Sequence, residues 1–251
     1  AGMSHFLEHM VFKGTRTRDA YAIALSLESV GGHLDAFTGR EVTCFDARVL
    51  EENMDLAVEV LADLVLNPKL DLEDIAKEKT IILDEIQTYE DTPEERIHDL
   101  FADVVWNGHP LGNRILGTRE SVDSFTREEV VRYHARHYAG SNLLVAVAGR
   151  FDWDRFVAQV EAWFRYAPNG APAELGSVES NRRDVVHHVK DLGQQYLCLC
   201  ARGVSLQHPD RHALISLSTL LGGGMSSRLF QRVREREGIA YSVYTYADFY
   251  R

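Results

Sequence analysis

Apolar residues recur every three or four positions over most of the first two thirds of this 251-residue chain. Residues with that spacing lie on one face of a helix, so the pattern predicts amphipathic helices. Gly31-Gly32 suits the C-terminal end of one helix, and Thr126 with Glu129 reads as a capping box at the start of another. The predicted helices cover residues 3–12, 18–30, 53–66, 73–89, 94–106, 126–137, 153–166, 213–221 and 228–235.

Strand patterns lie between these helices. Residues 33–50 read as a β-hairpin, because strand-forming residues flank a turn at Gly39. The wholly apolar run 143–148 predicts a buried strand. Alternation of apolar and polar residues predicts further strands at 184–190, 195–201 and 239–246. Hairpins separated by helices favour an α+β fold with an antiparallel-dominated sheet covered by helices.

The segment 168–181 interrupts the periodic pattern. It is rich in Pro, Gly, Ala, Ser and Asn, which is typical of a connection between domains. A chain of this length suits one large or two medium domains. We therefore expect a first domain at 1–166, a linker at 167–184 and the start of a second domain at 185–251.

Composition excludes some classes of function. The formal net charge of −11 argues against a nucleic-acid partner. No apolar run reaches the roughly 18 residues that a membrane span needs, so we expect no membrane partner. The cysteines, Cys44, Cys198 and Cys200, have no metal-site spacing, and their odd number suggests reduced thiols.

The run His5-Phe6-Leu7-Glu8-His9 carries the main chemical signal. On a helix, residues three and four apart are neighbours, so His5, Glu8 and His9 share one face. Two imidazoles and a carboxylate that can act as a base are the minimum set for a zinc hydrolase, and H-x-x-E-H is a known zinc-peptidase signature. The alternative is an ordinary surface helix with solvated side chains.

A catalytic zinc site needs a third protein ligand. The predicted helix at 73–89 offers Glu78 and Glu85. Seven residues make two helical turns, so both carboxylates lie on the same face. That face could meet the histidine face across a helix–helix contact.

These residues, with others along the chain, resemble the pitrilysin/insulinase/mitochondrial-processing-peptidase family of zinc metallopeptidases. The H-x-x-E-H motif is followed 76 residues after His9 by Glu85. Further pieces that resemble the family are Ala1-Gly2-Met3-Ser4, Phe12-Lys13-Gly14-Thr15, Gly31-Gly32 with Ala36-Phe37-Thr38, Glu90-Asp91-Thr92-Pro93, His109-Pro110-Leu111-Gly112, Ile115-Leu116-Gly117-Thr118, the run from Leu221 to Phe230, and the run from Arg234 to Tyr241.

The resemblance implies a zinc-dependent endopeptidase that hydrolyses extended peptides or presequences. In that scheme His5, His9 and Glu85 bind Zn²⁺, Glu8 is the general base, and Glu78 supports the site. Arg234 and Tyr241 of the second domain are implied to stabilise the oxyanion. The peptide substrate is implied to pair as an added strand along a segment that includes Gly32, Asp35, Ala36, Phe37 and Thr38.

The resemblance also implies two similar domains, with a few strands before Ala1 and much of the second domain after Arg251. It allows a homo- or hetero-dimer with a family member. Asp35 stands where many members have Asn, which leaves backbone pairing open and puts a side-chain amide contact in doubt. Two other functions remain as alternatives. One is a non-catalytic scaffold or partner subunit of the same fold. The other is a lyase of the S-ribosylhomocysteine type, which would need a cysteine as third ligand.

Overall fold

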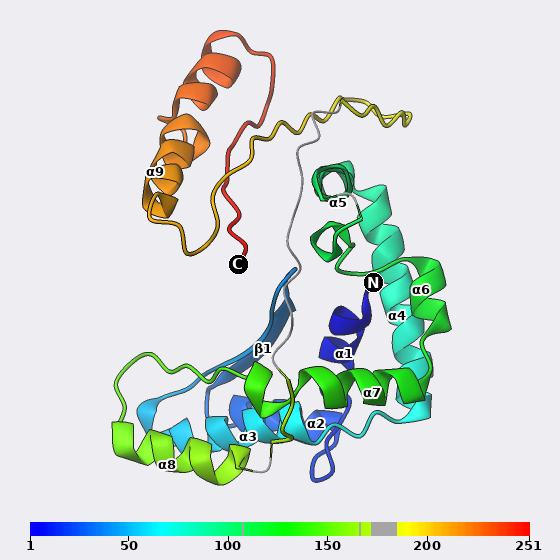
Figure 1. The fold of residues 1–251 in the computed structure, drawn as a ribbon, viewed down its shortest axis with the longest axis vertical. Coiled ribbons are helices and arrows are strands. Elements are labelled where there is room, and N and C mark those ends of the chain that lie inside the picture. Colours follow the sequence, from blue (N-terminus) through cyan, green and yellow to red (C-terminus); the bar gives the residue numbers. More distant parts are fainter. Residues whose placement is uncertain (107, 166, 172–184) are drawn as a thin grey trace. The chain divides into compact units, whose positions relative to one another are not determined.

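The computed structural model describes residues 1–106, 108–165, 167–171 and 185–251. These residues form two compact units, Ala1–Leu197 and Cys198–Arg251, which we describe separately (Figure 1). The expected linker at 167–184 falls largely outside the described residues. Helices and a two-stranded antiparallel sheet make up the fold, which confirms the expected α+β class. None of the described helices is long and apolar enough to cross a membrane.

Most of the first unit is helical, and the helices predicted from apolar periodicity are confirmed. The predicted Thr126–Glu129 capping box starts α7, and the side chain of Asp19 caps α2. The short helix α6 was not predicted. The α-helices are α1 (Met3–Val11), α2 (Ala20–Glu28), α3 (Met54–Leu66), α4 (Leu72–Asp91), α5 (Pro93–Val105), α6 (Arg119–Ser124), α7 (Arg127–His137) and α8 (Trp153–Phe164). Short 3-10 turns are η1 (Glu51–Asn53), η2 (Pro110–Gly112) and η3 (Gly140–Asn142).

Helix α1 lies at the centre of the first unit. It packs against α4, α7 and the β-hairpin (Figure 1). Its apolar residues Phe6, Leu7, Met10 and Val11 are fully buried. Burying a side chain of this size stabilises a fold by about 1.5–3 kcal/mol, so these contacts fix the rotation of α1 about its axis. The opposite face, with the histidines, is therefore held in one direction.

A close backbone approach sets where α1 begins. Gly2 precedes the helix with φ +84°, in the left-handed region that favours glycine. A Cβ atom at this position would lie 2.8 Å from the carbonyl oxygen of Leu116 and 2.9 Å from the Cα of Gly117. Only glycine fits between the start of α1 and this loop.

The predicted hairpin is confirmed. Strand β1 (His33–Thr38) pairs antiparallel with β2 (Thr43–Arg48), and Thr38 lies opposite Thr43 at the turn end. The N–H of Gly39 donates to the carbonyl of Val42 at 2.7 Å and closes the turn. Along β1, exposed residues alternate with the half-buried Leu34, Ala36 and Thr38. One face of the strand therefore lies against the protein.

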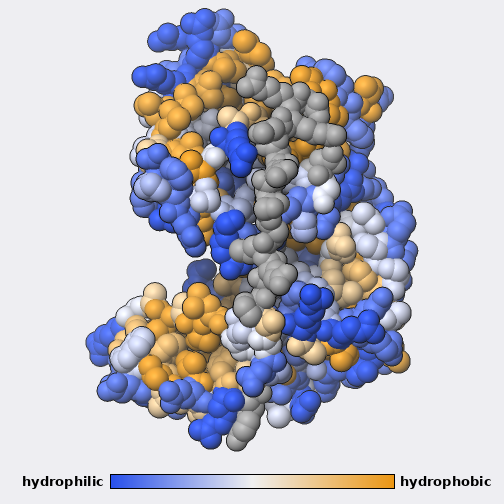
Figure 2. Space-filling model, viewed as in Figure 1, coloured by the Kyte–Doolittle hydropathy of each residue, from blue (hydrophilic) through white to orange (hydrophobic). Residues whose placement is uncertain are grey.

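The other predicted strands do not form paired strands among the described residues. The run 143–148 is extended but unpaired, and Leu144 is 92% exposed, so the expectation of a buried strand there is wrong. The described segments 185–190, 195–201 and 239–246 likewise form no strand, and residue 184 lies outside the described residues. A strand needs a neighbour for its backbone hydrogen bonds. Figure 2 shows apolar residues gathered on the surface around α8 and the extended segment before it, where Leu144 and Trp153 are exposed.

The second unit contains α9 (Arg211–Gly222) and a π-helical segment, η4 (Phe230–Arg236), which confirms the two helices predicted there. Gly238, with φ +62°, follows η4. The hydroxyl of Thr245 donates to the carbonyl of Ser218 at 2.6 Å, which joins α9 to the extended segment that follows η4.

Candidate metal centre

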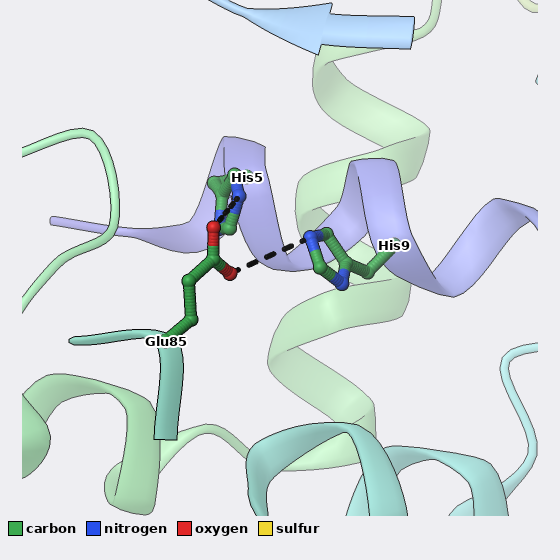
Figure 3. Close-up of side chains that lie close together, drawn as sticks. All are labelled: His5, His9 and Glu85. Carbon is green, nitrogen blue, oxygen red and sulfur yellow. Dashed lines mark ion pairs between the residues drawn. The ribbon is translucent and has the colours of Figure 1, made fainter. Parts of the chain in front are cut away.

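Two helices bring His5, His9 and Glu85 together (Figure 3). His5 and His9 lie one turn apart on α1, and Glu85 projects from α4 towards both rings. Nε2 of His5 is 3.8 Å from Oε1 of Glu85, and Nε2 of His9 is 3.8 Å from Oε2. One ligand atom from each residue lies within 4.8 Å of the others.

These distances fit a divalent ion better than direct bonding between the side chains. At 3.8 Å the imidazoles and the carboxylate are too far apart for a hydrogen bond. Tetrahedral zinc with bonds of about 2.0–2.2 Å would hold its ligand atoms about 3.4 Å apart. The two histidine–Glu85 distances are thus about 0.4 Å longer than an ion bound between them would set.

Metal binding requires neutral imidazole, and the two histidines differ in how their surroundings shift their pKa values. Burial, followed by the neighbouring His9, lowers the pKa of His5 to about 4, so this ring is neutral at pH 7. Nδ1 of His9 donates to Oε1 of Glu78 at 2.8 Å. That hydrogen bond raises the pKa of His9 despite its burial. It also fixes the neutral tautomer, in which Nε2 carries the lone pair on the side of Glu85.

Glu85 lies among other carboxylates. Burial raises its pKa above the usual value, His9 opposes the shift, and Glu8 and Glu78 add to it. A cation between the rings would relieve this crowding of negative charge. The donor set, two imidazoles and one carboxylate, is one that catalytic zinc accepts.

Glu78 is a buried anion behind the metal site. Only 2% of the residue is exposed, and its two oxygens accept from His9 and from Nζ of Lys13, the latter at 2.7 Å. Burial alone would raise its pKa, but these two donors lower it below the usual value. Glu78 therefore stays charged and holds the His9 ring. Lys13 was not predicted as part of the site, although it is a cation one turn beyond His9 in the sequence.

Glu8 has a different environment from the ligands. The hydroxyl of Thr38 donates to Oε2 of Glu8, which links α1 to the end of β1. Glu8 and His9 also line a pocket of about 240 Å³ between α1 and β1. The other lining residues are Phe12, Lys13, Leu34, Asp35, Ala36 and Glu78. The candidate base and one candidate metal ligand therefore face the same open space.

The remaining candidate residues lie on β1 or in the second unit. Gly32 precedes β1, and Asp35 and Phe37 are on its exposed side. In the second unit, the Arg234 guanidinium lies 5.1 Å from the centre of the Tyr241 ring, which is a cation–π contact. The structure thus brings these two residues together, and their role in catalysis stays a prediction.

Comparison with known families covers nearly the whole chain. A family model described as insulinase, peptidase family M16, matches residues 1–119. A second model, described as the peptidase M16 inactive domain, matches residues 124–251. The side chains of the candidate metal centre all lie within the first match.

Two curated relatives illustrate the similarity. An uncharacterised zinc protease of Bacillus subtilis is 41% identical over 250 residues, covering 99% of this chain and 61% of the relative. An uncharacterised zinc protease of Mycobacterium leprae is 40% identical over 267 residues, covering 100% of this chain and 57% of the relative. The chain thus spans about three fifths of the length of these relatives.

Solved structures share the fold. A protease from Helicobacter pylori superposes with a TM-score of 0.86 at 21% identity, covering 100% of this chain and 62% of that one. Pitrilysin superposes with a TM-score of 0.59 at 21% identity, covering 72% of this chain and 20% of that one. At 21% identity, the similarity of this chain to these two structures shows a shared fold.

Proposed function

Because this chain belongs to peptidase family M16, the insulinase family, we propose that it is a zinc-dependent endopeptidase whose metal ligands are His5, His9 and Glu85. The convergence of these three side chains from α1 and α4 is the observation that supports the proposal most strongly. The zinc protease names of the relatives support the choice of metal. When bound there, Zn²⁺ would polarise the scissile carbonyl and make water more acidic.

Glu8 is the general base in this proposal. It lines the pocket beside His9, so its carboxylate can take a proton from the attacking water. The same carboxylate then returns the proton to the leaving amine nitrogen of the cleaved peptide bond. Although Glu8 lies between the two histidine ligands in sequence, it is not a ligand in this proposal, because its Oε2 accepts from the hydroxyl of Thr38.

The outer edge of β1 is the proposed docking site for the peptide substrate. Gly39 and Val42 form a hydrogen-bonded pair, so alternation along an antiparallel ladder makes Thr38, Ala36 and Leu34 non-hydrogen-bonded positions. Their N–H and C=O groups therefore point away from β2. An extended peptide can pair with these groups as an added strand and pass the pocket.

This mode of binding favours cleavage within a chain. Strand pairing uses backbone groups, and it needs neither end of the substrate. The non-catalytic alternative is less favoured because the candidate ligands and the candidate base are all present in the first 119 residues. The lyase alternative is not favoured either, because Glu85, rather than a cysteine, stands at the third ligand position.

Replacing Glu8 with glutamine tests the proposal. The purified chain should bind about one zinc ion, and a chelator should abolish cleavage of an unstructured peptide. Glu8→Gln should keep the zinc and lower kcat by roughly 10²–10⁴-fold, because a general base contributes about that much.

The matched control is Glu128→Gln, which changes an exposed glutamate on α7. It should keep both zinc and activity. Metal content is measured by mass spectrometry, and cleavage is followed with a quenched fluorescent peptide. A chain that binds no zinc, or a Glu8→Gln variant that cleaves at the parent rate, would refute the proposal.

A further inference from the structure

Glu8 is held by a chain of two hydroxyl groups from the hairpin. The hydroxyl of Thr38 donates to Oε2 of Glu8, and Oγ1 of Thr38 lies 3.2 Å from Oγ1 of Thr43. A threonine hydroxyl has one proton. Because Thr38 uses its proton on Glu8, Thr43 must be the donor in the second contact. The two contacts therefore run from Thr43 to Thr38 and from Thr38 to the carboxylate.

The hairpin places these hydroxyls through its register. Thr38 and Thr43 lie directly opposite each other in the last pair before the turn, at a non-hydrogen-bonded position where side chains are closest. Thr38 is on the half-buried side of β1 with Leu34 and Ala36. The hydroxyl pair thus depends on both strands, and a shift of one residue would turn Thr38 away from Glu8.

The turn itself is anchored to the protein. The Arg40 guanidinium donates to the carbonyl of Leu111 at 2.6 Å and to that of Asn113 at 2.8 Å. The second terminal nitrogen of Arg40, Nη2, lies 3.4 Å from Oδ1 of Asp99. These contacts tie the hairpin end to η2 and α5. The threonine hydroxyls are therefore fixed by packed structure.

The two oxygens of Glu8 have different surroundings. Oε2 accepts from Thr38, whereas the described residues give Oε1 no hydrogen-bond donor. A base needs one oxygen held and the other available for the proton it accepts. Without the Thr38 hydroxyl, the carboxylate could rotate among its broad terminal torsion states.

We propose that Thr38 and Thr43 are positioning residues for Glu8, fixing the orientation of its carboxylate from the hairpin. This inference rests on the proposed function of Glu8 as the base. The resemblance implies strand pairing of the substrate with the segment that includes Thr38, and the role proposed here is a separate one for the Thr38 side chain. The backbone of Thr38 remains at the outer edge of β1, where a peptide would pair.

Isosteric replacement tests the proposal. Thr38→Val keeps the side-chain shape and removes the hydroxyl, so kcat should fall roughly 10–100-fold, with KM changed less than about 3-fold, as for outer partners of catalytic groups. Thr38→Ser keeps the hydroxyl and should restore most of kcat. Thr43→Val should lower kcat less, by about 3–10-fold, because it removes the second link only.

The matched control is Thr80→Val, which changes an exposed threonine on α4. Zinc content is measured for every variant, and it should stay unchanged. A rise in KM without a fall in kcat would instead assign Thr38 to substrate binding and overturn the proposal. Equal losses of kcat for Thr38→Val and Thr38→Ser would overturn it as well.

A second measurement does not depend on catalysis, so it separates failure of this inference from failure of the proposed function. The effect of Thr38→Val on the urea midpoint is measured for the metal-free chain, in the parent and in Glu8→Ala. The contact predicts a larger decrease of the midpoint when Glu8 is present, because the two residues are then coupled. Equal decreases in both backgrounds would show no coupling and overturn the proposal, whatever the kinetics.

Discussion

Replacing Glu78 with glutamine probes how a buried carboxylate supports metal binding. In the parent, one oxygen of Glu78 accepts from Nδ1 of His9 at 2.8 Å and the other from Nζ of Lys13 at 2.7 Å. Glutamine keeps the shape but has one acceptor oxygen and one NH₂ group. Since His9 and Lys13 are both donors here, one of them must face that NH₂ group without a bond.

The magnitude follows from these contacts. A hydrogen bond to a charged group contributes about 1.5–3 kcal/mol, and a neutral one about half as much. Loss of an outer partner of a metal-bound histidine typically lowers metal affinity about 10–100-fold. We therefore expect the zinc Kd of Glu78→Gln to rise by that factor, which corresponds to about 1.4–2.8 kcal/mol.

Zinc affinity is measured by competition between the metal-free chain and a chromophoric chelator. Glu73→Gln is the matched control, because Glu73 lies on the same helix, is exposed, and pairs with Lys77 at 2.7 Å. Its zinc Kd should stay within about twofold of the parent, since exposed ion pairs contribute little. An unchanged Kd for Glu78→Gln would mean that Glu78 is only a buried partner of Lys13, and the reasoning would fail.

Two further predictions concern stability and substrate binding. Asp63, 6% exposed, pairs with Arg18 at 2.8 Å; burial would raise the pKa of Asp63, but the hydrogen bonds it accepts lower it. The charged Asp63 therefore stabilises the fold fully above the pKa of the unfolded chain, near 3.8, and this stabilisation is lost as the pH falls through the lower pKa of the folded state. Asp63→Asn should lower the free energy of unfolding by about 3 kcal/mol at pH 7. Urea titrations should show the difference in unfolding free energy between the parent and Asp63→Asn shrinking below about pH 4. A difference that stays constant with pH would contradict the pairing. The carboxylate of Asp35 accepts from the N–H of Ala36 at 2.9 Å, on the proposed docking edge. Asp35→Ala should free that N–H for the substrate and so lower the KM for the peptide about 2–10-fold. Asp46→Ala is the control, and an increased KM for Asp35→Ala would contradict the docking mode.

Some of the candidate site followed from sequence because it depends on local geometry. Helical hydrogen bonds join residues four apart, so periodicity alone located α1 and α4. The same periodicity put His5 and His9 on one face of α1, and Glu78 and Glu85 on one face of α4. The hairpin was also predicted, since its turn and both strands are adjacent in the chain.

Other features depended on distant segments. The run 143–148 is apolar enough for a buried strand, yet Leu144 is exposed, because a strand forms only where a neighbour accepts its hydrogen bonds. The pairing of Glu78 with Lys13 was not predicted either. It required α4 to pack beside the end of α1 at one particular rotation.

The sequence by itself therefore determined which helices exist, which side chains share a helical face, and which chemistry those side chains could perform. Tertiary structure decided how that chemistry is divided. It placed Glu85 beside both histidine rings and Glu78 against Nδ1 of His9, and it brought Thr38, thirty residues away in the chain, to the carboxylate of Glu8. The physical reason is that side chains on different elements meet only after burial of the apolar faces has fixed the positions and rotations of those elements.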